Sequence, residues 1–227
     1  MKASSTKLDE QFFAQFGPFQ RFKKGETIIR AGDEPAGIYY LKKGFVRLYL
    51  ISADDKEITF NIYKPGTYFS MLWALGNIQN AYFFESISEV EVLKAPKDEV
   101  VKFLKSQPDI LSDLTKRTLI GLDGTIKLMQ ALLTGTASQK VCAVLLVLTR
   151  RFGKKKKNGE TLIQLPLTHK IIASLAGLTR ETTSLELLKL KKEQTIAQVG
   201  HFIIIKKPTK LEEESLIAQI ERVSFLP

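Results

Sequence analysis

The sequence has little of the chemistry that metals, redox centres and nucleophilic catalysis require. Its 227 residues include one cysteine, Cys142, and two histidines, His169 and His201. A single thiol cannot form an intramolecular disulfide, and it cannot by itself hold an iron–sulfur cluster or a structural zinc ion. We expect Cys142 to be a reduced, buried thiol on a helix.

The scarcity of histidine also argues against an enzyme. A metalloenzyme built on a β-roll would need histidines and carboxylates inside the roll, and the β-rich first part of the chain has no histidine. No Ser-His-Asp arrangement or phosphate-cradling glycine loop is recognisable either. We therefore predict no catalytic site, no metal, no haem and no iron–sulfur cluster.

Long hydrophobic segments are absent as well. No apolar stretch approaches the roughly 18 residues that suggest a membrane helix, and the N-terminal sequence MKASSTKLDE lacks the apolar region of a signal peptide. With 44% hydrophobic residues the chain can still bury a full core, and its length suggests one or two domains. These features predict a cytoplasmic protein that does not bind a membrane.

Two short helical patterns separated by Gly177 are present in residues 168–192. The first pattern has apolar residues at helical spacing and ends at Gly177, where a residue with positive φ would close a helix. Thr179 can cap the second helix, which places Arg180 and Glu181 in its first turn. This pattern is typical of a helix-turn-helix, in which the second helix reads DNA.

A candidate wing follows the second helix. Apolar runs at 196–199 and 202–205 flank Gly200, and residues 161–165 predict a further short strand. A helix-turn-helix with two such strands behind it is typical of the winged form of the motif.

The distribution of charge agrees with a DNA-binding second half. The chain has a formal net charge of +10, and residues 138–227 contain sixteen Lys or Arg against eight Asp or Glu. Such an excess is expected of a domain that contacts phosphates. The run Lys154–Lys157 fits either a phosphate contact or a solvated loop.

The first hundred residues predict a β-barrel or β-roll. Short β runs between residues 22 and 95 are separated by Gly25, Gly32, Gly44 and Gly66, and this alternation favours a closed β structure. The runs are TIIR, GIYYL, FVRLYL, EITFNIY, TYFSML and EVEVLKA.

Residues 108–136 predict one long helix with two neighbouring apolar stripes. We expect one stripe to pack on the β-roll of its own chain and the other on the same helix of a second chain; the alternative is a monomer that buries both. Gly121 and Gly124 weaken the helix by about 1 kcal/mol each, yet they permit close backbone approach. The first stripe is Leu114, Thr118, Gly121, Thr125, Leu128 and Leu132; the second is Leu119, Leu122, Ile126, Met129 and Leu133.

The order of these parts resembles the Crp/Fnr family of bacterial transcription regulators. The segments RFKKGETIIRAGDEPAGIYYLKKGFVRLY, KPGTYF and LAGLTRETTSLELLKLKKEQTI match the family in order. The resemblance implies an α+β fold with three parts: a double-stranded β-roll of the cyclic-nucleotide-binding type in residues 1–107, a dimerisation helix in 108–137 and a winged helix-turn-helix in 138–227. It also implies a sequence-specific regulator that binds double-stranded DNA at a palindromic operator as a homodimer, with RNA polymerase as a further partner.

The effector site departs from the family pattern. Members that bind cyclic AMP hold its phosphate and ribose with a glutamate and an Arg-Ser or Arg-Thr pair after the last Pro-Gly turn of the roll. Here Ser70–Leu72 replace the glutamate motif, and Asn80 and Ala81 replace the pair. Residues 68–84 contain no charged side chain, whereas a buried phosphate needs charged donors. We expect that cyclic AMP is not the natural ligand.

Two alternatives remain for the apolar side chains of this segment. They line a pocket for a small apolar effector, or they simply fill the roll. A roll with an apolar ligand would also suit a sensor or scaffold module that acts on a protein partner. The candidate pocket consists of Phe69, Ser70, Met71, Leu72, Tyr82, Phe83, Thr125 and Ile126.

The second helix of the helix-turn-helix supplies the candidate base contacts. Arg180 can make a bidentate contact with guanine, and Glu181 can accept a hydrogen bond from a cytosine amino group. Leu185 stands where family recognition helices often have arginine; it can contact a thymine methyl group, or form a patch with Leu188 for a protein partner. The predicted DNA-binding residues are Thr168, His169, Lys170, Thr179, Arg180, Glu181, Thr182, Ser184 and Leu185.

Overall fold

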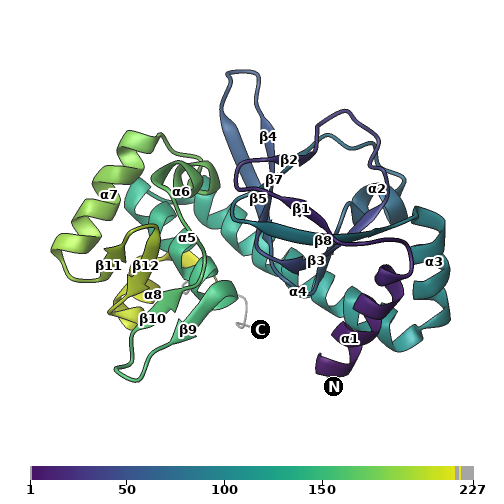
Figure 1. Cartoon of the computed structure of the whole chain (residues 1–227). Coiled ribbons are helices and arrows are strands. Elements are labelled where there is room, and N and C mark those ends of the chain that lie inside the picture. The colour runs from purple at the N-terminus through teal and green to yellow at the C-terminus, as the bar shows by residue number, and fades with distance from the viewer. Residues whose placement is uncertain (1, 218–219, 221–227) are drawn as a thin grey trace, which may run out of the picture. The chain divides into compact units, whose positions relative to one another are not determined.

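The computed structural model describes residues 2–217 and 220, with side chains from Leu8 onward. The chain forms two compact units, Met1–Arg117 and Thr118–Pro227, whose elements are labelled in Figure 1. Within the described residues, no helix has the length and apolar character that crossing a membrane would require.

The first unit is a roll of two four-stranded antiparallel sheets. One sheet has the strand order β1-β8-β3-β6 and the other β2-β7-β4-β5 (Figure 1). The predicted β-roll is therefore confirmed, although β1 and β7 were not predicted. The strands are β1 (Gln20–Phe22), β2 (Thr27–Ile29), β3 (Ile38–Lys43), β4 (Val46–Ile51), β5 (Glu57–Tyr63), β6 (Thr67–Phe69), β7 (Phe83–Ser86) and β8 (Val90–Ala95).

Glycine makes the turns of the roll as predicted. The φ angles of Gly25, Gly32, Gly44 and Gly66 are 88°, 88°, 85° and 81°, a region that favours glycine. Gly44 is the most constrained, because a Cβ there would lie 2.0 Å from the carbonyl oxygen of Glu89.

Aromatic rings fill the space between the two sheets. Phe69 is fully buried, and its ring stacks on Tyr39 with centroids 4.9 Å apart and lies 5.4 Å from the ring of Phe84. Aliphatic side chains from both sheets, such as Leu41 and Val92, complete this core. Burial of the large apolar area of these rings stabilises the roll.

Besides the short helix α2 (Met71–Gly76), two helices of the first unit were not predicted from the sequence. They are α1 (Lys2–Ala14) and α3 (Lys97–Ser106). Phe12 of α1 stacks on Phe103 of α3 at 4.0 Å, and the fully buried Phe13 stacks on Tyr40 of β3. The two helices thereby extend the core to one outer face of the roll.

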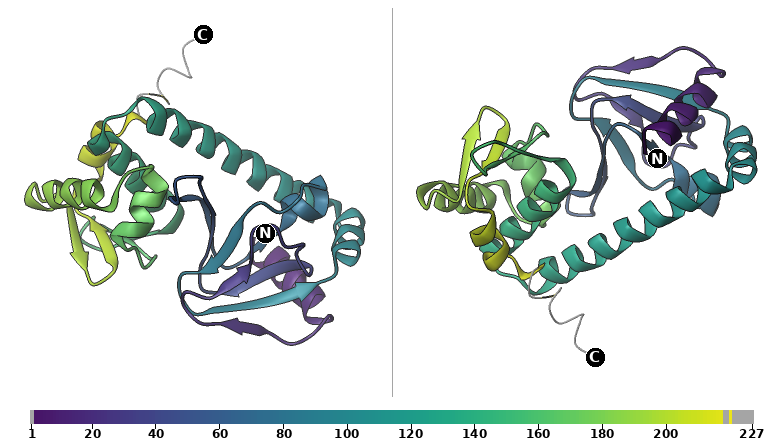
Figure 2. Two further views of the ribbon diagram at one scale, coloured as in Figure 1. Left: turned by 90° about the horizontal axis from the view of Figure 1, so that it is seen from above. Right: turned by 90° about the horizontal axis from the view of Figure 1, so that it is seen from below.

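The long helix α4 (Pro108–Thr134) is continuous and ends two residues before its predicted end (Figure 2). Thr136 then caps the next helix, α5 (Ala137–Phe152), in a capping box: its hydroxyl accepts from the Gln139 backbone N–H, and the Gln139 side chain accepts from the Thr136 N–H. The capping box formed by Thr136 and Gln139 thus marks the start of α5 directly after the end of α4.

The second unit is built around α5, whose apolar face is buried. Cys142 on this helix is fully buried, as predicted. Burial, with the nearby charge of Glu214, raises the pKa of its thiol to about 12, so the reactive thiolate is suppressed at neutral pH. Around α5 lie α6 (His169–Ala176), α7 (Arg180–Lys192) and α8 (Pro208–Glu214).

The wing is a four-stranded sheet with the order β11-β12-β10-β9. Its central hairpin, β11 (Ile196–Val199) and β12 (Phe202–Ile205), lies at the predicted residues. β10 (Thr161–Ile163) is shorter than predicted, and β9 (Gly153–Lys155) was not predicted. Lys154 and Lys155 therefore belong to an exposed edge strand and not to a loop.

Candidate nucleic-acid interface and effector pocket

The turn between α6 and α7 is fixed by local hydrogen bonds. Thr168 caps α6, because its hydroxyl accepts from the Ile171 N–H at 3.2 Å. Gly177 has a φ of 62° and ends that helix, and the Leu178 N–H then donates to the Ala173 carbonyl at 3.1 Å. The predicted end of the first helix at Gly177 is confirmed, whereas the cap at Thr168 was not predicted.

The second helix, α7, begins at Thr179 as predicted. The Thr179 hydroxyl accepts from the Thr182 N–H at 3.1 Å and lies 2.9 Å from the Thr182 hydroxyl. Thr183, Leu187 and Leu190 face inward, with 0%, 1% and 3% of each residue exposed. This buried stripe fixes which side of α7 points outward.

Glu186 lies beside the buried stripe, and its role was not predicted. Only 8% of the residue is exposed, and its carboxylate pairs with Lys189 at 2.8 Å. A buried carboxylate needs such a partner. Its spacing of three residues from Thr183 and four from Leu190 was the sequence signal that could have indicated burial.

The outward side of α7 carries Arg180, Glu181 and Leu185, which are all exposed. The side chains of Arg180 and Glu181 form no ion pair or hydrogen bond with any residue that the structure describes. They are thus available to a partner at the N-terminal turn of the helix, where base contacts are made in helix-turn-helix proteins.

Two residues of the predicted DNA-binding set join α6 to α7. Nδ1 of His169 lies 2.7 Å from the Ser184 hydroxyl, which itself donates to the Arg180 carbonyl at 2.8 Å. Nδ1 is therefore the donor in the first of these bonds. Both residues are half-buried, and their first role is to position the helices, whereas Lys170 at the start of α6 is exposed.

The basic side chains of the second unit are largely exposed. None of the exposed lysines named next pairs with an acidic group within residues 2–217. They are Lys154, Lys155, Lys157, Lys192 and Lys206. Unpaired cations of this kind attract phosphates and make binding sensitive to salt.

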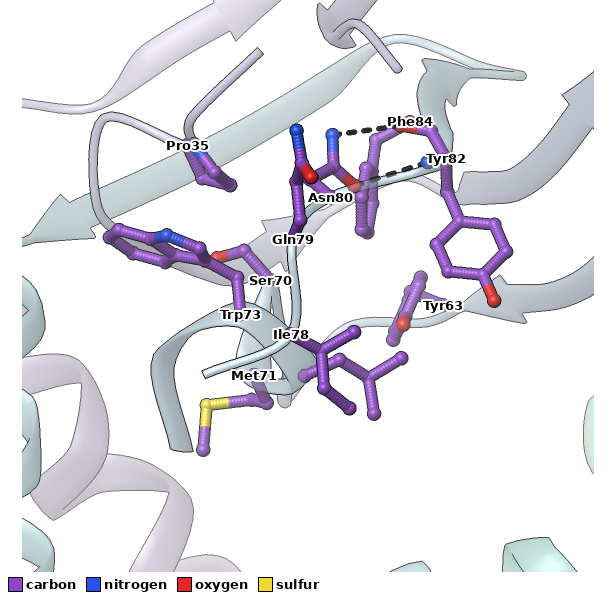
Figure 3. A pocket seen from close by; sticks show the side chains of 11 residues that line it. Pro35, Tyr63, Ser70, Met71, Trp73, Ile78, Gln79, Asn80, Tyr82 and Phe84 are labelled. Carbon is purple, nitrogen blue, oxygen red and sulfur yellow. Dashed lines mark hydrogen bonds between the residues drawn. The ribbon is translucent and has the colours of Figure 1, made fainter. Parts of the chain in front are cut away.

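The first unit contains a small cavity beside β6 and the short helix α2 (Met71–Gly76) (Figure 3). Its volume is about 20 Å³, which is room for about one water molecule. The lining contains no charged residue. The residues that line it are Pro35, Tyr63, Ser70, Met71, Leu72, Trp73, Ile78, Gln79, Asn80, Tyr82 and Phe84.

The polar groups at this cavity serve the protein's own backbone. Asn80 is 7% exposed, and its amide donates to the Tyr82 carbonyl at 3.0 Å (Figure 3). The same amide donates to the Arg30 carbonyl at 2.7 Å. The Ser70 hydroxyl donates to the Gly37 carbonyl at 2.8 Å. The resemblance described above implies ligand contacts at both positions in members that bind cyclic AMP, and here the two side chains hold loops together.

The structure places the predicted pocket residues in different surroundings. Ser70, Met71, Leu72 and Tyr82 line the cavity, but Phe69 belongs to the core and does not. The predicted strand TYFSML ends at Phe69, because Ser70 has a φ of 67° and leaves the extended conformation.

Three further residues of the predicted pocket do not line this cavity. Phe83 pairs with Tyr49 across the β4–β7 ladder and stacks on its ring at 5.2 Å. Thr125 and Ile126 lie on α4 in the second unit, and both are exposed. The spacing of residues along the sequence could not show that these three side chains lie outside the cavity.

The apolar stripes of α4 differ in exposure. Every member of the second stripe is more than half exposed, from 52% at Ile126 to 76% at Leu133. In the first stripe Thr118, Gly121 and Thr125 are also exposed, so it is not covered along its middle. Both stripes of α4 thus include exposed residues.

Comparison with known proteins agrees with this architecture. The family model for the cyclic nucleotide-binding domain matches residues 19–107, and that for the Crp-like helix-turn-helix domain matches residues 139–214. The chain is 29% identical over 201 residues to the global nitrogen regulator of Nostoc sp., covering 86% of this chain and 88% of that protein. It is 27% identical to the nitrogen fixation regulation protein FixK of Bradyrhizobium diazoefficiens, covering 88% and 83%.

Solved structures show the same fold. A CRP/FNR family regulator from Thermus thermophilus superposes with a TM-score of 0.69 at 23% identity, covering 87% of this chain and 98% of that one. FixK2 from Bradyrhizobium japonicum gives a TM-score of 0.71 at 22% identity, covering 87% and 96%. With both domains matched in order, and with relatives that span nearly its full length, the chain belongs to the Crp/Fnr family of DNA-binding transcription regulators.

Proposed function

We propose that this regulator binds an inverted-repeat operator as a homodimer joined through the second stripe of α4. The observation that carries the dimer is the exposure of that stripe, whose five apolar residues follow the alternating spacing of three and four that helices use to pair. An exposed apolar row of this length is stabilised when a second copy covers it.

Two glycines on the same helix support a close helix pair. A Cβ at Gly121 or Gly124 would meet no atom within 4 Å among the described residues. Nothing in that part of the chain therefore requires glycine, although each costs the helix about 1 kcal/mol relative to alanine. Close approach of the α4 helix of a second chain explains why glycine occupies both positions.

Dimerisation sets the geometry of DNA reading. Two recognition helices related by a twofold axis meet successive major grooves about 34 Å apart, which requires an inverted repeat. In each copy Arg180 makes a bidentate contact with guanine and Glu181 accepts from a cytosine amino group. Thr168, Thr179 and Lys170 are proposed to face phosphates, and RNA polymerase is the proposed further partner of the bound dimer.

The β-roll is proposed not to serve as a cyclic AMP receptor. Its cavity holds about one water molecule, it has no charged lining residue, and Ser70 and Asn80 are bonded to the backbone. A bound phosphate in such a place would have no cationic partner, which makes its burial unfavourable. The protein therefore binds its operator without a cyclic nucleotide.

Selection of bound sequences from random DNA tests the central proposal, because an inverted repeat in the selected pool reports both binding and dimer symmetry. Ile126→Lys introduces a charge into the stripe and should lower both the sedimentation mass and the affinity for the selected operator. Ile120→Lys is the matched control, since Ile120 is 62% exposed on the same helix but lies outside the stripe. A pool without a repeat, or a dimer that survives Ile126→Lys, would contradict the proposal.

A further inference from the structure

The outward side of α7 is apolar beyond its first turn. Leu185 is 60% exposed and Leu188 is 47% exposed, although both lie on a short helix that is packed into a well-formed unit. An isolated exposed leucine needs no explanation, but two on one side of a recognition helix form a patch.

Helical geometry centres this patch on the side that meets DNA. At about 100° per residue, Glu181, Leu185, Leu188 and Lys192 follow one line opposite the buried stripe of α7. All four side chains are exposed. The leucines therefore lie between an acidic residue in the first turn and a basic residue in the last turn.

The neighbouring hydroxyl groups are already engaged within the protein. The Ser184 hydroxyl donates to the Arg180 carbonyl and contacts His169, and the Thr182 hydroxyl lies 2.9 Å from that of Thr179. From the end of the first turn of α7 to Leu188, the two leucines are therefore the side chains that remain available for contact with a partner.

We infer that Leu185, assisted by Leu188, reads the 5-methyl group of thymine in the major groove of the operator. The inference rests on the proposed function and adds a base preference to it. The thymine methyl is the one apolar group that a base pair presents in the major groove. Leucine matches that group and donates no hydrogen bond, so it selects thymine over the other bases.

DNA fits this patch better than a protein partner does. The leucines continue the line that Glu181 begins, and the unit that carries them has about twice as many basic as acidic residues. Leu185 lies four residues beyond Glu181, or about 6 Å along the helix axis. At about 3.4 Å per base pair, the thymine is expected about two base pairs from the cytosine that Glu181 is proposed to contact.

Replacing thymine by deoxyuridine in the selected operator removes the methyl group and nothing else. With the full chain, we expect substitution at one position in each half-site to weaken binding about fourfold per half-site, the value of one buried methyl-sized group. Substitution at the other thymines should have no such effect. Binding is measured by fluorescence anisotropy at fixed salt, because affinity depends on salt concentration.

A protein variant assigns the effect to its side chain. Leu185→Ala should bind thymine and deoxyuridine operators equally, whereas Val199→Ala, a truncation of a 64% exposed residue on the wing, should keep the fourfold difference. Equal binding of both operators by the unaltered chain, or a full difference in Leu185→Ala, overturns the inference. The second result would assign the patch to a protein partner. If the chain retains no oligonucleotide at all, the proposed function fails together with this inference.

Discussion

The cavity of the β-roll and the outward side of α7 differ from the family in the same way but have opposite surroundings. In both places neutral side chains stand where related proteins often have charged ones. At the cavity, Ser70 and Asn80 are 4% and 7% exposed and are bonded to the backbone. On α7, Leu185 is 60% exposed and contacts solvent.

The comparison shows that the consequence of replacing a charged residue depends on whether the new side chain is buried or exposed. Where the replacing residue is buried and bonded, the site is filled and the ligand contact is lost. Where it is exposed, a surface remains and its chemistry changes from hydrogen bonding to apolar contact. The two proposals follow this difference: the roll is proposed not to bind cyclic AMP, and α7 is proposed to read a base that the family pattern does not imply.

The largest expected effect comes from truncating a residue of the roll core. Phe69→Ala removes a ring that stacks on Tyr39 and packs on Phe84, so the free energy of unfolding should fall by about 3–5 kcal/mol. Leu185→Ala removes an exposed side chain and should change it by less than about 0.5 kcal/mol. Urea denaturation measures both, and a large loss in Leu185→Ala would break the comparison.

The next effect concerns DNA affinity. Arg180→Ala should weaken operator binding by about 1–3 kcal/mol and relax the preference at one base position, because a bidentate contact is lost. Its unfolding free energy should stay unchanged, since the side chain is exposed. Anisotropy titration against a panel of operator variants measures this. Lys192→Ala is the control, and it should weaken all sequences equally; an unchanged preference in Arg180→Ala would reject the assignment.

A smaller effect separates loop support from ligand contact at Asn80. Asn80→Ala removes hydrogen bonds to the Arg30 and Tyr82 carbonyls, and thermal or urea unfolding should show a loss of about 1–2 kcal/mol without any ligand. Gln79→Ala alters the exposed neighbour at the same cavity and should have little effect. Equal stability of the two variants would mean that Asn80 is free to serve a ligand.

The smallest expected effect is the response to cyclic AMP. A ligand at one hundred times its Kd would stabilise the native state by about 2.7 kcal/mol. With no charged side chain at the cavity, we expect millimolar cyclic AMP to leave Tm unchanged. A rise in Tm that Asn80→Ala abolishes would show that the cavity opens for the nucleotide.

Local sequence patterns predicted most of the helices, strands and turns, because these features depend on interactions between residues that are close in the sequence. Gly25 and Gly44 occupy positive φ, Thr179 caps its helix, and β11 and β12 occupy the predicted residues around Gly200. Each depends on one residue or on a short periodicity. The helices α1 and α3 were missed because their stability comes from packing on the roll, through contacts such as that of Phe12 with Phe103.

The sequence by itself determined the order of the parts, the position of the first turn of α7 at Arg180 and Glu181, and the absence of charged donors between Tyr68 and Phe84. Only the tertiary structure decided which apolar residues are core and which are surface. Ser70 bonds to a carbonyl 33 residues away, and Asn80 to one 50 residues away. Such contacts depend on how strands and loops that are distant in the sequence pack together, so the spacing of residues along the chain does not predict them.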